Sequence, residues 1–144
     1  MGSGAGGNNE NGATTVETAV TIFPFMLVIL GLIQITLFSF NLASIQYSLN
    51  RAARFGLLGV TLAGQPSREA SILKRFEETA NALSIDTTGV SLKICPVANP
   101  GCATNNAGGS GQYVVLTATK VVQSILGFGD LSVSAKVLVR NEPF

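Results

Sequence analysis

Glu17 lies at the front edge of a long apolar segment, and its position is the feature of the sequence that most invites chemistry. No Lys, Arg, Asp, Glu or His occurs from Thr18 to Asn50. A carboxylate beside such a segment is costly in lipid, so it needs a partner or must be neutral. If the chain is cut after Gly12, the new amine of Ala13 lies about one helical turn from Glu17. That amine could pair with Glu17 of the same chain or of a neighbour, and the pairing would set the register of bundled helices.

Cys95 and Cys102 are the two cysteines of the chain. The sequence between them, Cys95-Pro-Val-Ala-Asn-Pro-Gly-Cys102, holds two prolines and a glycine, which suit a tight loop. A redox pair or a metal pair is the alternative, but the spacing is not CxxC and no other ligands stand nearby. We therefore predict a structural disulfide, which places the C-terminal part of the chain outside the cytosol.

The sequence has no histidine, and its formal net charge is +1. Without histidine, Ser-His-Asp and Cys-His catalytic arrangements are impossible, and the commonest metal ligand is missing. A net charge this close to zero argues against nucleic-acid binding driven by phosphate neutralisation. No motif arranges a nucleophile with a base. We therefore predict a protein that is not an enzyme and that uses no cofactor, no metal ion and no nucleic-acid partner.

The apolar segment itself, residues 18–40, is predicted to cross a membrane. As a helix it spans roughly 34 Å, which matches a hydrocarbon core of about 30 Å. A secretory signal peptide is the alternative, but its apolar region would be shorter, about 7–15 residues, and would follow a basic start. The helical period continues beyond the segment, so we expect one long N-terminal helix over residues 13–63. Pro24 lies inside it and is expected to kink or loosen it.

The rest of the chain predicts a small α+β domain over residues 64–144, whereas residues 1–12 read as a leader or flexible polar segment. Ser67 begins an amphipathic helix that ends before Asp86. The period then changes to two over residues 90–94, 113–119 and 131–140, which is typical of strands. We expect an antiparallel sheet of three to four strands with one face packed on helices.

Several of these motifs resemble a known family. Gly12-Ala-Thr-Thr-Val-Glu17 resembles the processing site of type IV prepilins, with a glycine before the cut and a glutamate fifth in the mature chain. Val16-Glu17-x-Ala19, the proline at position 24 and Gln34 narrow the resemblance to the TadE-like pilins of the tight-adherence (Flp) pilus system. The sequences Asn50-Arg51-Ala-Ala-Arg-Phe-Gly56 and 131–142 resemble that family's stretch after the membrane helix and its final strand.

The resemblance implies a structural, pilin-like subunit that is inserted in the inner membrane and cleaved after Gly12 by a prepilin peptidase. It implies assembly with other pilin subunits through the N-terminal helices, with the inner-membrane pilus machinery and membrane lipid as further partners. The C-terminal domain would lie outside the cytosol or on an extracellular pilus, in adhesion or secretion. A minor pilin or pseudopilin is the first reading. A main filament subunit and a single-pass membrane-anchored binding domain are the alternatives.

Overall fold

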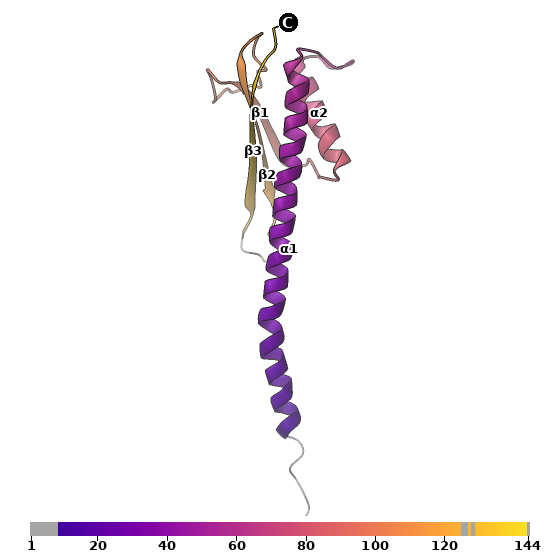
Figure 1. Ribbon diagram of the computed structural model, residues 1–144, viewed down its shortest axis with the longest axis vertical. Coiled ribbons are helices and arrows are strands. Elements are labelled where there is room, and N and C mark those ends of the chain that lie inside the picture. Colours follow the sequence, from indigo (N-terminus) through magenta and orange to yellow (C-terminus); the bar gives the residue numbers. More distant parts are fainter. Residues whose placement is uncertain (1–8, 125–126, 128, 144) are drawn as a thin grey trace, which may run out of the picture. The chain divides into compact units, whose positions relative to one another are not determined.

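The computed structural model describes residues 9–124, 127 and 129–143, without the side chains of residues 9–13. Two helices and three strands follow one another along the chain (Figure 1). They are α1 (Asn9–Leu57), α2 (Arg68–Ala82), β1 (Val90–Pro96), β2 (Tyr113–Val122) and β3 (Leu131–Arg140). The predicted α+β class is confirmed, with its long apolar helix, second helix and antiparallel sheet. The chain divides into two units, residues 1–36 and residues 37–144, and α1 contributes to both.

The three strands form one antiparallel sheet in the order β1-β2-β3. The central strand β2 pairs with both neighbours, so that Thr117 lies between Lys93 and Lys136 in the register. Alternate residues point to opposite faces of a sheet, and the burial of β2 follows this period. Val114, Leu116 and Ala118 are buried, whereas the residues between them are partly exposed. One face of the sheet is therefore covered and the other is open.

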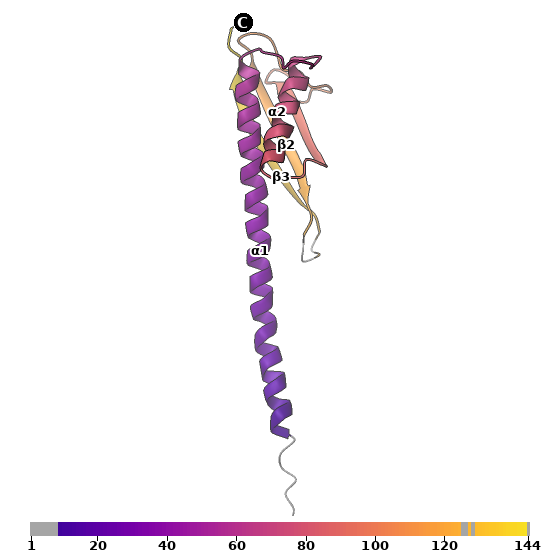
Figure 2. The same ribbon diagram turned by 90° about the vertical axis from the view of Figure 1, so that its right-hand side faces the viewer.

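The covered face packs against α2 and the C-terminal part of α1, which Figures 1 and 2 show on the same side of the sheet. Within residues 37–144 this packing forms one hydrophobic cluster. Its fully or almost fully buried members include Ile45, Leu49, Ala52 and Ala53 of α1, Ile72 and Phe76 of α2, and Ile94, Leu116 and Val133 of the sheet. The apolar side of the amphipathic helix α2 and the apolar face of the alternating strands both contribute to this cluster.

Small residues on α1 allow α2 to approach closely. A Cβ atom added to Gly56 would lie 2.8 Å from Cδ1 of Ile72, closer than such atoms normally come. Ser48 of α1 is also completely buried, and its hydroxyl has no hydrogen-bond partner among the described residues. A larger side chain at either position would have to displace core side chains, which is costly in a close-packed interior.

The bounds of α1 differ from the predicted 13–63 at both ends. The helix begins at Asn9, because extending an existing helix adds one hydrogen bond per residue and needs no new nucleus. It ends at Leu57. The amides of Leu58 and Gly59 donate to the carbonyls of Phe55 and Gly56, and Gly59 takes a left-handed φ of 67°. The amide of Glu142 donates to the carbonyl of Leu57 over 3.2 Å. The C-terminal segment thus satisfies a carbonyl that the helix leaves free.

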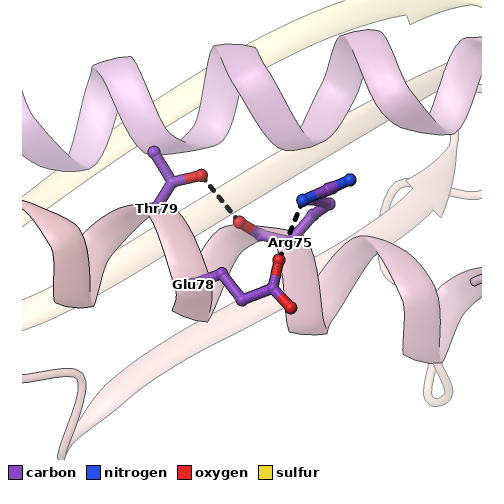
Figure 3. A network of polar contacts seen from close by, with 3 residues as sticks. All are labelled: Arg75, Glu78 and Thr79. Atoms are coloured by element: carbon purple, nitrogen blue, oxygen red, sulfur yellow. Dashed lines mark hydrogen bonds and ion pairs between the residues drawn. The ribbon is translucent and has the colours of Figure 1, made fainter.

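The second helix begins where the sequence predicts. Ser67 is its N-cap, and the hydroxyl of Ser67 accepts a hydrogen bond from the amide of Ala70 over 3.2 Å. Within α2, Arg75 pairs with Glu78 at 3.0 Å, and the hydroxyl of the buried Thr79 donates to the Arg75 carbonyl (Figure 3). The Arg75 guanidinium also lies 5.3 Å from the centre of the Phe55 ring, so it connects α2 to α1.

The loop between β1 and β2 is held by side chains from distant parts of the chain. The carboxylate of Glu69 accepts from the amide of Ala107 at 3.0 Å, and the guanidinium of Arg68 donates to the Ala107 carbonyl. The buried Asn141 donates to the carbonyls of Ala107 and Gly109 at 2.8 and 2.9 Å. These bonds attach a glycine-rich loop to α2 and to the end of β3.

A disulfide joins Cys95 and Cys102, with the two Cα atoms 5.7 Å apart. Cys95 belongs to β1, and Cys102 lies in the loop that follows it. The predicted pairing is confirmed. The bond closes the first part of the β1–β2 connection, and the bonds to Glu69, Arg68 and Asn141 hold the second part.

Candidate functional site

The N-terminal part of α1 exposes its apolar side chains all around the helix. Val20 and Phe23 are each 67% exposed, and Ile35 is 63% exposed. In the most apolar window of this helix, only 6% of the residues are buried. A helix that is apolar on every side is stable only when lipid or other helices cover it. The helix from Thr14 to Leu57 is long and apolar enough to cross a membrane, consistent with a single-pass membrane protein.

Hydroxyl groups in this segment are satisfied within the helix itself. The side chains of Thr18, Thr21 and Thr36 each donate to the backbone carbonyl four residues earlier, at distances of 2.7 to 2.9 Å. Bonds of this kind let a polar side chain enter an apolar environment without leaving a donor unpaired. The threonines therefore do not prevent the segment from entering lipid or a bundle of helices.

The structure places Gly12, Ala13 and Glu17 on the same helix, within two turns of one another. Ala13 and Glu17 are four residues apart, a spacing that puts two positions on one face of a helix. The carboxylate of Glu17 makes no hydrogen bond or ion pair with any residue that the structure describes. The side chain of Ala13 lies outside the described atoms, and the cut after Gly12 and the pairing with Glu17 stay predictions.

Glu17 does not stand alone on its face, a feature that the sequence analysis missed. Thr14 lies three residues before it and Thr21 four residues after it, so both flank it on the helix surface. Together with Thr18 and Ile22, these residues line one shallow depression. We call Thr14, Glu17, Thr18 and Thr21 the polar patch. Its signal in the sequence is the spacing of threonines at three and four residues around a glutamate.

Pro24 lies inside α1, and the helix continues through it without interruption. Proline removes one backbone donor, so the carbonyl four residues earlier loses its usual partner. The kink that we expect at Pro24 stays a prediction. Gly31 follows seven residues later, and nothing lies within 4 Å of the position that a Cβ atom would take there. The surface around Gly31 is therefore open in the single chain.

Two carboxylates in residues 37–144 have a shifted pKa, and local contacts cause both shifts. Partial burial raises the pKa of Glu69, but hydrogen bonds from the Ala107 amide, its own amide and Ser67, helped by the charge of Arg68, outweigh it. The pKa of Glu69 therefore lies below its usual value of 4.5. A hydrogen bond from Thr88 lowers the pKa of the exposed Asp86. The described residues contain no group of three or more Cys, Asp or Glu side chains that could hold a metal ion.

Comparisons with known proteins match the N-terminal part of the chain to a protein family. Residues 12–54 match the family described as TadE-like protein. No curated protein and no solved structure matches the chain. The matched range begins at Gly12 and contains the polar patch, Pro24, the exposed apolar helix and the two arginines at positions 51 and 54. It ends before α2 and the sheet. The resemblance to TadE-like proteins is confirmed for residues 12–54, which are similar to that family, whereas residues 131–142 lie outside the matched range.

Proposed function

We propose that this chain is a pilin-like structural subunit of a tight-adherence pilus. The subunit resides in the inner membrane as a single-pass protein before it is incorporated into the pilus. The observation that carries the proposal is the exposed apolar N-terminal part of α1, which lies within the TadE-like segment. The family match suggests pilus-system partners in general. The finer role as a minor pilin, and the particular partners named below, are our proposal.

The exposed helix surface can serve both states of such a subunit. Before assembly, lipid covers residues 18–40, whose length as a helix is about that of a hydrocarbon core. After assembly, the same side chains pack against the helices of neighbouring pilins. Gly31 supports the second state, because small residues let helices approach closely and the space around this glycine is open.

The polar patch gives this assembly a direction and a register. Cleavage after Gly12 by a prepilin peptidase would create a positive charge on the amine of Ala13. Glu17 of a neighbouring subunit, or of the same chain, would then pair with that amine. An unpaired carboxylate is costly in an apolar bundle, so displaced registers that leave Glu17 alone would be disfavoured. Buried polar pairs are best attested in this role of fixing register.

The α/β unit would lie outside the cytosol, where a disulfide persists. This unit comprises residues 37–144 with the whole sheet, and its part after the membrane segment, from residue 41 on, would lie on that side. A folded unit of this size is larger than the very short major pilins of tight-adherence systems. We therefore favour a minor pilin or pseudopilin over the main filament subunit, with the inner-membrane pilus machinery as the partner that incorporates it.

Intact-mass measurement tests the processing step directly. The chain is expressed with and without an active prepilin peptidase and is extracted from membranes. We expect Ala13 as the first residue only in the host that has the peptidase. Gly12→Val is the matched variant and should stay uncut in both hosts. An uncut wild-type chain in the host with active peptidase would contradict the proposal and favour a membrane-anchored binding domain that never polymerises.

A further inference from the structure

We propose that the open face of the sheet binds an acidic polysaccharide, with Lys93 and Lys136 holding a carboxylate of the sugar chain. The three strands carry four cations and no carboxylate. Two of the four are already engaged. Lys120 donates to the carbonyl of Asp86 at 2.8 Å, and the Arg140 guanidinium lies 5.7 Å from the centre of the Tyr113 ring. Lys93 and Lys136 remain, both exposed.

The two lysines face the same point of the sheet. Thr117 pairs with Lys93 on one side and with Lys136 on the other. Their Cα atoms are therefore two strand spacings apart, about 9.5 Å. Neither lysine makes a hydrogen bond or an ion pair within the described part of the chain. An anionic group placed above Thr117 can thus be reached by both ammonium groups, and it would offset their mutual repulsion.

The surface between the lysines is hollow. A concavity of about 260 Å³ lies there, and the disulfide loop closes one end of it. Its lining residues are Lys93, Cys95, Pro100, Val115, Thr117 and Lys136. A cavity with a partly apolar floor, a central hydroxyl and cations on both sides fits a sugar ring that bears a carboxylate.

The neighbouring row of the sheet favours a sugar over other polyanions. Ser91, Thr119 and Ser134 lie side by side in the register, and the Thr119 and Ser134 hydroxyls are 3.5 Å apart. Hydroxyl side chains can donate and accept at once, which matches the hydroxyls of a sugar. Single-stranded nucleic acid instead needs a series of free aromatic rings for stacking. Tyr113 is the aromatic residue of the three strands. It lies on this face, and the Arg140 guanidinium already lies over its ring.

The inference needs the sheet to face the cell exterior, and in this respect it rests on the proposed function. Its test is independent of pilus assembly. The full chain is purified in detergent, and its binding to immobilised polygalacturonate is measured beside uncharged dextran, an oligo-dT strand and polyglutamate. Lys93→Gln/Lys136→Gln is the variant, and Lys74→Gln, which removes an exposed lysine of α2, is the control. Thermal melting checks that each variant is folded.

We expect polygalacturonate to bind most tightly, to weaken with added salt, and to lose about tenfold in affinity in the double variant while Lys74→Gln changes little. Absence of binding, equal binding to uncharged dextran, or an equal loss in Lys74→Gln would overturn the proposal. Tighter binding of oligo-dT or of polyglutamate would also overturn it, in favour of a nucleic-acid or acidic-protein partner respectively. A failure to form pili would leave this result unaffected, so the two proposals fail separately.

Discussion

The two units of the chain treat apolar side chains in opposite ways. In the segment before residue 37, leucine, valine and phenylalanine side chains point outwards and more than half of the surface of many remains exposed. In residues 37–144, the same residue types form a closed core with almost no exposure. One helix, α1, contributes to both units. The difference therefore does not arise from secondary structure but from what covers the helix.

The comparison indicates that the α/β unit buries a hydrophobic core of its own, whereas the N-terminal segment does not. Burial in the first unit has to come from lipid or from other chains. Substitutions should accordingly separate into two groups. Those in the α/β unit should change folding of the single chain, and those in the N-terminal segment should change assembly and leave folding intact.

The largest effect is expected from a matched pair of leucines on α1. Leu49 is completely buried, whereas Leu32 is 59% exposed. Leu49→Ala should lower the free energy of unfolding by about 2–5 kcal/mol, because it loses buried surface and leaves a cavity. Leu32→Ala should change it by less than about 0.5 kcal/mol. Denaturant unfolding of the detergent-solubilised chain, followed by near-ultraviolet circular dichroism, measures both. Equal losses would break the distinction between the units.

The disulfide should give the next largest effect. Cys95 and Cys102 are seven positions apart. Closing so short a loop restricts the unfolded chain by about 2–3 kcal/mol in the chain-entropy account. Cys95→Ser/Cys102→Ser should therefore destabilise the α/β unit by that amount, and adding a reductant to the wild type should reproduce the change. If the reductant lowers the midpoint of the double variant as well, its effect does not come from this bond.

A matched pair of glycines on α1 sharpens the same distinction. Gly56→Ala brings a Cβ atom to 2.8 Å from Ile72, and Ile72 is held in the core. The variant should lose about 1–3 kcal/mol of unfolding free energy through overpacking. Gly31→Ala has open space in the single chain and should gain a few tenths to about 1 kcal/mol from helix propensity. Thermal melting compares the two, and a stable Gly56→Ala chain would contradict the close α1–α2 contact.

The smallest effect concerns the carboxylate that holds the β1–β2 loop. The pKa of Glu69 is lower in the folded chain than its usual value of 4.5, so its contribution is present above that pH and is lost as the pH falls below it. Because Glu69 is only partly buried, we expect Glu69→Gln to cost no more than about 1 kcal/mol at pH 7.

Unfolding at pH 7 and at pH 3 checks this carboxylate. The difference between Glu69→Gln and the wild type should be clear at pH 7 and small at pH 3. Glu77→Gln, an exposed glutamate on the same helix, is the control and should follow the wild type at both values. A Glu69→Gln defect that persists at pH 3 would show that charge is not the cause. Asp86, whose pKa is also lowered, should keep part of the acid dependence in every variant.

Local patterns predicted most of the fold. The start of α2 at Ser67, the alternation in β3 and the spacing of the two cysteines each depend on residues close in sequence, and the structure bears out each of them. The end of α1 could not be predicted in this way. The carbonyl of Leu57 is satisfied by the amide of Glu142, a partner from the other end of the α/β unit.

The attachment of the β1–β2 loop was hidden from the sequence for the same reason. The bonds from Glu69 and Asn141 to Ala107 cross more than thirty residues each. No sequence period or spacing predicts contacts between residues so far apart in the chain. Around Glu17 the situation differs, because the flanking threonines at three and four residues are a local signal. The polar patch could therefore be predicted from the sequence, once the three- and four-residue spacing is placed on a helix.

The central claim is that Glu17 acts in assembly and not in folding, and one comparison tests it most directly. Wild type, Glu17→Ala and the control Glu77→Ala are expressed in a host with a working tight-adherence system, and the chain is quantified in sheared filaments and in membranes. We predict that the amount of Glu17→Ala in the filament fraction falls about tenfold or more, because the positive amine of Ala13 is left unpaired in the bundle of helices. Its membrane fraction and its melting temperature should stay at the wild-type level. Filament incorporation of Glu17→Ala equal to that of Glu77→Ala would contradict the account.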